Sequence, residues 1–413
     1  MRRAVITGLG LVAPGIRFRG PGSLGTSATP ERGDSAEEFA DACFSGRGGL
    51  RETTLFPADG LSTAIFGEVE GLPAGRGRFP AMLRGAAEGM LRSAGVTDED
   101  VASWGSRCRL FLGTLLTDAV EAFYRRSLAR QEGRDGAEQA AGLHDYSSYA
   151  KKVLGVRGAV NVISTACASG TTAAGMALDY IRHGICDAAV AGGADPLTYT
   201  EAAGFNALRA MSKDTCNPFD EARDGISIGE GAAFFLFESL EHAKARGANI
   251  LCEAAGYATG NDAYHITALA PGGEGAFHVM EEALRDAGIA PADVDYINAH
   301  GTGTKVNDRE EATAMGRLFG GAGEVDMSST KALIGHAMGA SGAIELASVI
   351  LSMQRGQSLP MPHLERPIPM AGNIRVSASS HPIRIRCAMS NSFAFGGNMA
   401  SFLVKQYEGG GDA

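Results

Sequence analysis

Several features that mark other classes of protein are scarce in this sequence, and basic charge is the first of them. The chain has 37 Lys and Arg against 47 Asp and Glu, which gives a formal net charge of −10 at pH 7. Proteins that bind nucleic acid are normally basic, so this balance argues against a nucleic-acid partner. A local basic patch for an acidic partner remains compatible with it.

Long apolar stretches are also missing. No part of the sequence approaches the ~20 apolar residues that span a membrane. The apolar start is interrupted by Gly8, Gly10 and Pro14, before it reaches the length of a signal peptide. We therefore expect neither a membrane segment nor a secretion signal.

The seven cysteines form no recognisable pattern. Their number is odd, their spacing is irregular and no C-x-x-C pair occurs, so neither a disulfide framework nor a zinc site is indicated. Reduced thiols are the rule in the cytoplasm, and we expect a cytoplasmic protein without a bound metal.

Glycine, in contrast, is abundant, with 57 residues of 413, about twice the usual share. Stretches typical of strands alternate with helical patterns along the chain, which predicts an α/β fold with mainly parallel or mixed sheets covered by helices. From about Asn249 the order of strands and helices repeats. This suggests a duplicated α/β unit, with residues 1–248 and 249–413 as its halves.

The N-terminus contains a nucleotide-binding pattern in the wrong context. A strand predicted at residues 4–7 is followed by a G-x-G-x-x-A match that begins at Gly8. In a dinucleotide site a helix follows this turn at once and points its N-terminus at a pyrophosphate. Here residues 15–34 have loop composition, and a helix is predicted only from near Ser35. We therefore predict a first strand, a glycine turn and no nucleotide site.

Cys167 stands at an abrupt change in the sequence. It lies between "NVIST", which is typical of a strand, and "ASGTTAAG", a run of very small residues. A helix of such residues can lie close to other backbone, and a thiolate at its positive N-terminus is stabilised. The strand-turn-helix order resembles a nucleophile elbow. Alternatively, Cys167 is a small apolar residue of the core, and this segment alone does not decide between the catalytic and the structural interpretation.

Two histidines and a lysine have comparable settings. His300 ends an apolar stretch and opens "HGTGT", a position typical of strand-end active sites in α/β sheets. His336 lies in "STKALIGHAMGASG", five residues after Lys331. A single histidine beside glycine is more often structural. A nucleophilic cysteine needs partners, however, and these residues at element ends together favour one site.

These segments carry a resemblance to a known family. "TACASG" around Cys167, "NAHGTGTKVND" around His300 and "STKALIGHAMGASG" around His336 resemble the signature blocks of elongating β-ketoacyl-ACP synthases with a Cys-His-His site. "NPFDEARDGISIGEGAA", "GYATGNDAYHIT" and "SNSFAFGGN" fit the same family in the same order. The resemblance covers nearly the whole chain. It implies the thiolase fold, in which two βαβαβαββ halves form a five-layered αβαβα sandwich.

The resemblance also implies a reaction. Cys167 would take an acyl group from the phosphopantetheine arm of an acyl carrier protein, and a malonyl group on the same kind of carrier would lose CO₂. His300 and His336 would bind the enolate oxygen, and backbone N–H groups of Cys167 and Phe395 would form an oxyanion hole. The product is a 3-oxoacyl chain two carbons longer, with no cofactor bound by the chain itself. Family members are usually dimers, so we expect a homodimer or a heterodimer with a chain-length-factor-like subunit.

Matching positions imply further roles. Lys331 and Glu345 would form a polar network that orients the histidines, Thr302 and Thr304 would bind pantetheine, and Phe395 would gate the acylated cysteine. The remaining matched residues are expected to be structural or to lie behind the reacting groups; they are Asp262, His265, Asp308 and Glu311.

The sequence departs from the family pattern around the expected pocket. Ile226 stands where the family has a phenylalanine that lines the site, and Ala394, Asn398 and Met399 change the family's "GFGGTN". With the long loop at residues 15–34, these changes favour a type II polyketide synthase subunit over a housekeeping fatty-acid enzyme. Two alternatives from other classes stay open: a non-catalytic chain-length-factor-like partner, and a cysteine-dependent acyltransferase that acts on an amine or alcohol.

Overall fold

The computed structural model describes residues 1–18, 35–115, 117–131 and 143–409, so most of the predicted loop at 15–34 lies outside the described residues. The strands of the N-terminal part are β1 (Ala4–Val12), β2 (Leu50–Glu52), β3 (Ile65–Gly67), β4 (Cys108–Gly113), β5 (Val160–Ile163), β6 (Ala188–Asp195) and β7 (Gly231–Ser239). Those of the C-terminal part are β8 (Cys252–Asn261), β9 (Tyr296–Asn298), β10 (Val325–Ser328), β11 (Ile374–Val376), β12 (Cys387–Phe393) and β13 (Asn398–Lys405).

A continuous sheet of 11 strands runs through the described part of the molecule, and its two halves, called here the first and the second sheet, have the same topology; β2 and β3 form a separate pair. The order β5-β4-β6-β7-β1 in the first corresponds to β10-β9-β12-β13-β8 in the second, and β11 extends the second at its edge. In each sheet the first three strands pair in parallel, and each of the last two pairs antiparallel with the strand before it. The sheets join where β1 pairs with β8. The predicted duplicated α/β fold is therefore confirmed.

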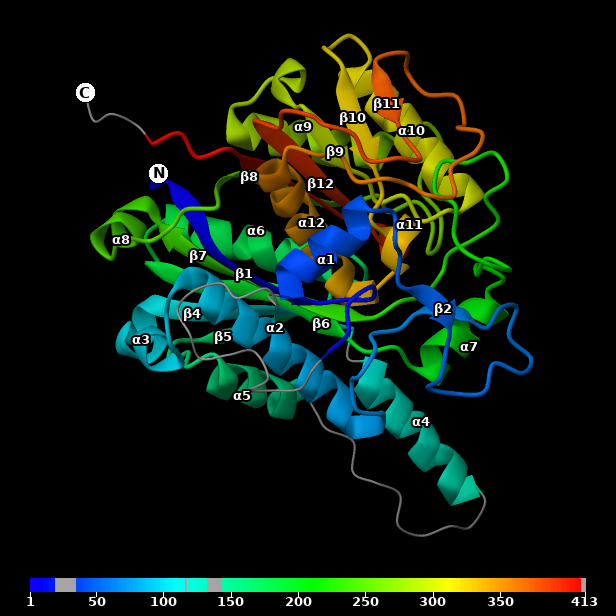
Figure 1. Cartoon of the computed structure of the whole chain (residues 1–413), viewed down its shortest axis with the longest axis horizontal. Helices are drawn as coiled ribbons and strands as arrows, with labels where there is room; N and C mark the ends of the chain where they lie inside the picture. The colour runs from blue at the N-terminus through cyan, green and yellow to red at the C-terminus, as the bar shows by residue number, and fades with distance from the viewer. Residues whose placement is uncertain (19–34, 116, 132–142, 410–413) are drawn as a thin grey trace.

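Helices separate and cover the two sheets (Figure 1). Between the sheets lie α6 (Ser169–Arg182) and α12 (Ser341–Arg355). On the outer face of the first sheet are α2 (Arg78–Ala94) and α5 (Leu143–Val153), and on that of the second are α9 (Glu274–Ala287) and α10 (Lys305–Phe319). The remaining helices are α1 (Ser35–Phe44), α3 (Asp98–Ser103), α4 (Thr117–Gln131), α7 (Tyr199–Ala207), α8 (Leu240–Ala245) and α11 (Lys331–Ile334).

Strand β7 shows why the layers form. Phe234 and Leu236 pack in the outer apolar cluster, whereas Phe235 and Phe237 pack in the central one. Successive strand residues point to opposite faces, so a strand that is apolar at every position needs cover on both sides. The division between residues 248 and 249 falls between α8 and β8 and stays a prediction.

The predicted glycine turn after residue 7 is wrong, because β1 continues to Val12. Gly8 and Gly10 face α2, and a Cβ on Gly10 would lie 2.1 Å from the backbone nitrogen of Met90. These glycines therefore allow a helix to lie directly on the strand. They do not turn the chain.

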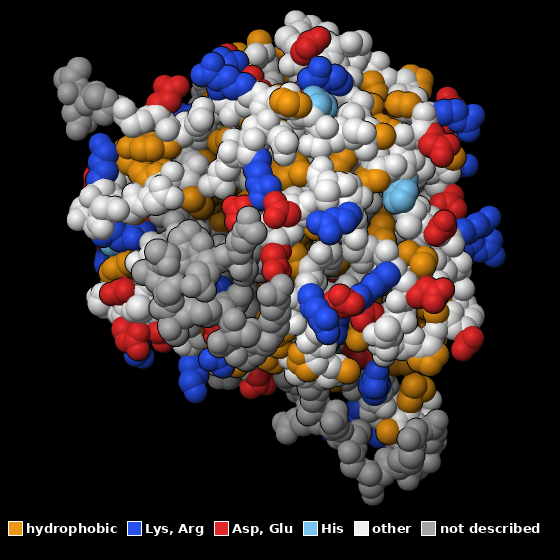
Figure 2. All heavy atoms as spheres, in the orientation of Figure 1, with side chains coloured by type: hydrophobic (Ala, Val, Ile, Leu, Met, Phe, Trp, Pro, Cys, Tyr) orange, Lys and Arg blue, Asp and Glu red, His pale blue; other side chains and the backbone are white. Residues whose placement is uncertain are grey.

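Helix α4 extends away from the body of the molecule (Figure 1). Its exposed apolar side chains are Val120, Phe123, Tyr124 and Leu128, and Phe123 is 69% exposed. Over the face of the molecule that Figure 2 shows, acidic and basic side chains are interspersed. None of the helices in the described part of the chain has the length and apolar character to span a bilayer.

Candidate active site

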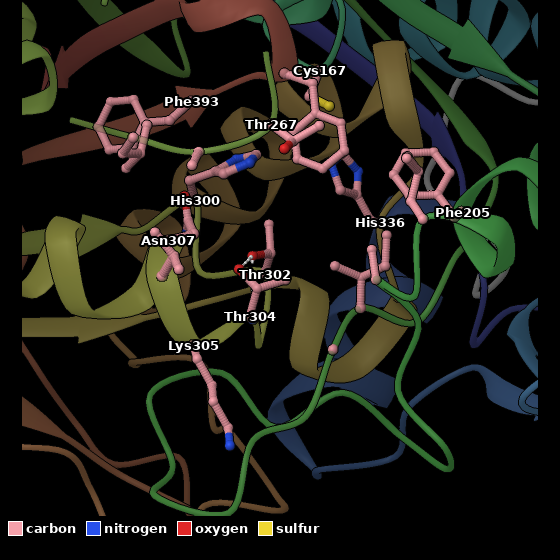
Figure 3. Close-up of a pocket in the computed structure, with 18 of the residues that line it drawn as sticks. Cys167, Phe205, Thr267, His300, Thr302, Thr304, Lys305, Asn307, His336 and Phe393 are labelled. Carbon is pink, nitrogen blue, oxygen red and sulfur yellow. Dashed lines mark hydrogen bonds between the residues drawn. The ribbon is translucent and has the colours of Figure 1, made fainter. Parts of the chain in front are cut away.

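A pocket of about 410 Å³ collects residues from both halves of the chain (Figure 3). Cys167 comes from the first half, and His300 and His336 come from the second. The rest of the wall consists of Phe205, Leu208, Arg209 and Ala210, residues 224–226, 267–269 and 302–307 except Gly303, and residues 393–395. Three of the four residues that the sequence analysis grouped thus face one cavity.

The turn between β5 and α6 presents Cys167 to this cavity. Ala166 has a φ of 51°, a left-handed conformation that is uncommon for a residue with a Cβ. Ser169 braces the turn, because its Oγ donates to the Ala166 carbonyl at 2.6 Å and accepts from the Thr165 backbone N–H at 2.9 Å. The cysteine therefore sits on a tight bend directly before the central helix α6.

The Cys167 thiol is mainly protonated at neutral pH. Burial raises its pKa to about 11, while Lys331 and the backbone N–H groups of Phe395 and Cys167 act in the opposite direction. The backbone N–H groups at the start of α6 thus favour the thiolate, as expected, but desolvation outweighs them. The backbone N–H groups of Phe395 and Cys167 do lie at the sulfur, where the family resemblance expects oxyanion donors.

The small residues of α6 serve a close crossing with α12. A Cβ built on Gly170 would lie 2.6 Å from the Ala343 backbone nitrogen, and one on Gly342 would lie 2.0 Å from Thr171 Oγ1. The two helices therefore meet in backbone contact. This contact fixes the start of α6, which follows the cysteine, against the start of α12, which follows His336.

His300 is held by its backbone as well as by its ring. It follows β9, and the Glu311 carboxylate on α10 accepts hydrogen bonds from the backbone N–H groups of His300 and Gly301, both at 2.8 Å. Burial raises the pKa of Glu311 to about 7, and these two hydrogen bonds oppose the shift. Glu311 thus positions the loop that carries the histidine.

Lys331 connects His300 to a buried carboxylate. Its Nζ lies 3.2 Å from His300 Nδ1, donates to the His300 carbonyl oxygen at 2.6 Å, and forms an ion pair with Glu345. The side chains of Lys331 and Glu345 are both buried. An ammonium group has no lone pair to offer, so His300 Nδ1 accepts and the ring proton of the neutral imidazole is on Nε2.

The tautomer of His336 is fixed by backbone geometry. The Met338 backbone N–H donates to His336 Nδ1 at 3.1 Å, and Ser341 Oγ lies 2.8 Å from the same nitrogen. A backbone N–H can only donate, so the proton of this neutral ring is also on Nε2. Both imidazoles therefore have an N–H on the atom that the protein does not occupy.

Both rings stay neutral at ordinary pH. Burial lowers the pKa of His300 and of His336 well below the usual value, and the positive charge of Lys331 lowers both further. The ring centroids are 5.5 Å apart with an interplanar angle of 85°, and both rings lie near Cys167 in the cavity (Figure 3). The arrangement offers two neutral N–H donors to one developing negative charge.

Thr302, Thr304 and Ile226 also line the cavity. The two threonine hydroxyls lie 3.0 Å apart, so they form one polar strip on the wall of the cavity. Asp308 is buried behind this strip and accepts the backbone N–H groups of Thr302 and Gly303 at 3.1 and 3.2 Å. Asp308 therefore shapes the strip without reaching the cavity.

Phe395 lies on a loop that is tied to a neighbouring loop. Its ring stacks on Phe205, with centroids 5.7 Å apart and an interplanar angle of 27°. Gly396 N–H donates to the Ile266 carbonyl at 2.8 Å, and Asp262 N–H donates to the Gly397 carbonyl at 2.9 Å. The aromatic pair covers the cavity beside the sulfur.

Two of the matched residues lie farther from the reacting groups. His265 is exposed and accepts the Thr267 backbone N–H at 3.1 Å, so only Thr267 reaches the cavity. The Asp262 carboxylate accepts the Ala270 backbone N–H at 2.6 Å. Both residues shape the loop around residues 262–270.

Sequence reasoning missed several residues of the site. Ser341 was in a quoted segment, but its contact with His336 depends on how the chain folds back before α12. Phe205 and Arg209 gave no signal, because α7 was not predicted. No group of three or more His, Cys, Asp or Glu in the described ranges is arranged to hold a metal ion.

Comparisons with known proteins agree with this geometry. The profiles "Beta-ketoacyl synthase, N-terminal domain" and "Beta-ketoacyl synthase, C-terminal domain" match residues 77–243 and 251–365. A Streptomyces cyaneus protein with the provisional name polyketide beta-ketoacyl synthase 1 is 33% identical over 98% of both chains. This chain belongs to the β-ketoacyl synthase family.

Other members of the family match over different lengths. The 3-oxoacyl-[acyl-carrier-protein] synthase 2 of Staphylococcus aureus is 44% identical over 62% of this chain, and the match spans 63% of the length of that protein. The ishigamide ketosynthase/chain length factor superposes with a TM-score of 0.86 at 28% identity, over 98% of this chain and 100% of the other. The thiolase-type fold expected from the resemblance is thus confirmed.

Proposed function

We propose that this chain is an elongating β-ketoacyl-ACP synthase that joins an acyl group on Cys167 to a malonyl group with loss of CO₂. The observation that carries the proposal is the meeting of one thiol, two backbone N–H groups and two neutral imidazoles in a single cavity. Each later step uses one of these groups.

Acylation comes first. The Cys167 sulfur attacks the thioester carbonyl of the acyl carrier, and the oxyanion accepts hydrogen bonds from the N–H groups of Cys167 and Phe395 that already lie at the sulfur. The carrier thiol leaves with the proton that the cysteine gives up. Preorganised donors of this kind contribute roughly 3–4 kcal/mol each to transition-state stabilisation.

Decarboxylation and condensation follow. The malonyl thioester loses CO₂, and the electron pair of the broken C–C bond forms an enolate whose oxygen accepts from Nε2–H of His300 and His336. The enolate carbon then attacks the acyl-Cys167 carbonyl. The cysteine sulfur leaves as a thiolate and takes up a proton from solvent, and the 3-oxoacyl product stays on the carrier. Neutral imidazoles suit this role because each has a proton to donate without a charge to desolvate.

The other predicted roles fit the same scheme. Lys331 and Glu345 fix the tautomer of His300. The hydroxyl strip of Thr302 and Thr304 offers hydrogen bonds to the amides of a pantetheine arm. Phe395 would move aside to admit the acyl chain, because its ring covers the cavity beside the sulfur.

For the pathway we propose type II polyketide assembly, with housekeeping fatty-acid elongation as the alternative. The polyketide relative aligns over 98% of its length, whereas the fatty-acid-type match spans 63%. An acyl carrier protein would deliver the substrates. A second subunit, identical or chain-length-factor-like, would cover the exposed apolar side of α4. A cytoplasmic location remains a prediction.

Two measurements test the function. The protein is incubated with an acyl carrier thioester and Cys167 is examined by peptide mapping, and CO₂ release from malonyl carrier protein is then followed. We expect one acyl group on Cys167 and one CO₂ for each 3-oxoacyl product. An unlabelled Cys167 would favour a non-catalytic partner, and acyl transfer to an amine or alcohol without CO₂ would favour the acyltransferase.

A further inference from the structure

Glu201 is a buried acid that none of these steps uses. It lies in the first turn of α7, where its backbone N–H donates to Thr198 Oγ1 at 3.3 Å. Both side-chain oxygens are shielded from solvent, and among the described residues neither has a partner with full hydrogen-bond geometry, although the Thr198 backbone N–H acts on the carboxyl group. Buried polar atoms are nearly always hydrogen-bonded, because a group that leaves water without gaining a partner is costly. This carboxyl group therefore calls for an explanation.

The surroundings of Glu201 favour its neutral form. Burial, and then the negative charge of Asp195, raise its pKa well above the usual value, and the Thr198 backbone amide offsets this only in part. Glu230 adds further negative charge. Asp195 accepts backbone N–H groups and Glu230 pairs with Arg78, so both neighbouring carboxyl groups have hydrogen-bond donors of their own. In the neutral form that these surroundings favour, Glu201 has one O–H to donate and one carbonyl oxygen to accept.

The position of Glu201 relates it to the substrate cavity. Phe205 is four residues later on α7, so the two side chains lie on one face of the helix, one turn apart. Phe205 lines the cavity and stacks on Phe395. Glu201 does not itself line the cavity; it lies one turn before Phe205 on the same face of the helix that carries this aromatic residue.

We propose that Glu201 determines substrate specificity by hydrogen bonding an oxygen substituent, carbonyl or hydroxyl, on the acyl chain that Cys167 carries. The inference rests on the proposed function, since it needs an acyl-cysteine. A saturated alkyl chain would leave the carboxyl group without a partner, whereas a keto or hydroxy chain supplies one. The chain then selects oxygenated acyl groups over fully reduced ones of the same length.

The test compares three thioesters of one length on the full chain. Hexanoyl, 5-oxohexanoyl and 3-oxohexanoyl pantetheine are each incubated with wild type, Glu201→Met and Glu201→Gln, and the rate of Cys167 acylation is read from the intact mass. For each protein, the acylation rate with an oxo thioester is divided by the rate with hexanoyl pantetheine. The wild-type ratio is then divided by the variant's ratio, and in this quotient the intrinsic reactivity of each thioester cancels. We expect this quotient to be about 10 for Glu201→Met with at least one oxo chain, the effect of one lost hydrogen bond. For Glu201→Gln, which keeps a donor and an acceptor, we expect it to stay below about 3.

Controls separate this inference from the proposed function. Asn206→Ala alters α7 at a residue that hydrogen-bonds the Ser62 backbone, and its quotient should stay near 1. Retained hexanoyl transfer shows that the Glu201→Met site is folded; if this variant does not fold, Glu201→Leu replaces it. A quotient near 1 for both oxo chains with the apolar variant overturns the inference and leaves the proposed function intact. Failure of every thioester to acylate Cys167 in the wild type overturns both.

Discussion

The two halves of the chain share a topology but contribute opposite chemistry. In the first half, the parallel strand β5 is followed by a turn with Cys167 and the central helix α6. At the equivalent place in the second half, β10 is followed by Lys331, His336 and the central helix α12. One turn thus supplies the nucleophilic sulfur, and the other supplies hydrogen-bond donors.

The comparison extends to the next strand of each sheet. After β9 the chain places His300 in the cavity, whereas the residue that follows β4 is Thr114, whose hydroxyl donates to Asp195 at 2.8 Å. Asp195 in turn accepts the Gly339 backbone N–H at 2.9 Å, in the turn that carries His336. The first half therefore supports the second structurally at the place where the second supplies a reacting group. Two halves of the same topology thus place different residues at these strand ends, and together they form one asymmetric site.

Breaking each half separately should give the largest effects. Cys167→Ala should lower condensation at least about 1,000-fold, because no acyl-enzyme forms, while Cys167→Gln should keep or increase CO₂ release from malonyl carrier protein.

His300→Ala or His336→Ala should lower that CO₂ release about 100-fold, because a donor to the enolate is lost. Neither should change Cys167 acylation more than about fivefold. A histidine variant that decarboxylates normally but does not acylate would contradict the division of labour between the halves.

The raised pKa of the cysteine predicts a steep pH dependence in the first half. With a thiol pKa of about 11, the thiolate fraction grows about tenfold per pH unit below that value. Alkylation of Cys167 by iodoacetamide, followed by peptide mass spectrometry, should rise accordingly from pH 7 to pH 9. A plateau reached by pH 8 would mean that the resting residue is a thiolate after all.

The lowered pKa values of His300 and His336 predict that decarboxylation, the step supported by the second half, depends little on pH. Wild-type decarboxylation should be flat between pH 8 and pH 6, because both rings are neutral throughout. Lys331→Met removes a charge that lowers the pKa of both rings, so the acid limb should move up by about one pH unit. The double variant Lys331→Met/Glu345→Gln removes the carboxylate left without its partner and should show the same shift. Identical acid limbs in wild type and both variants would rule out this role for Lys331.

The smallest expected effect tests the contact between the halves. Gly170→Ala puts a methyl group 2.6 Å from the Ala343 backbone, which should lower the free energy of unfolding by about 1–3 kcal/mol. Because α6 is displaced with its first residues, Cys167 acylation should also slow. Gly204→Ala, also within a helix but with nothing within 4 Å of the new Cβ, is the matched control: it should leave Cys167 acylation unchanged and should not lower the free energy of unfolding, because alanine favours a helix.

Local sequence patterns predicted the parts of this molecule that depend on local physics. Strands apolar at every position and the small-residue helix α6 were predictable, because burial and close packing restrict residue type directly. Helix α7 was not, since its apolar residues do not gather on one face. The Nε2–H tautomers also could not be predicted, because the Nδ1 partner of His300 is 31 residues away and that of His336 depends on a turn.

Gly8 and Gly10 show a different limit. Glycine marks both turns and close backbone approaches, and here it permits α2 to lie on β1. Only the position of the partner element decides between the two meanings.

The most direct test of the account is a single turnover with preformed acyl-Cys167 enzyme. The isolated acyl-enzyme is mixed with carboxyl-labelled malonyl carrier protein, and labelled CO₂ and carrier-bound products are quantified together. The account predicts one labelled CO₂ per 3-oxoacyl chain, with the cysteine returned to its free form, and a loss of both signals in His300→Ala and His336→Ala. Transfer of the acyl group with the malonyl carboxylate intact would contradict it.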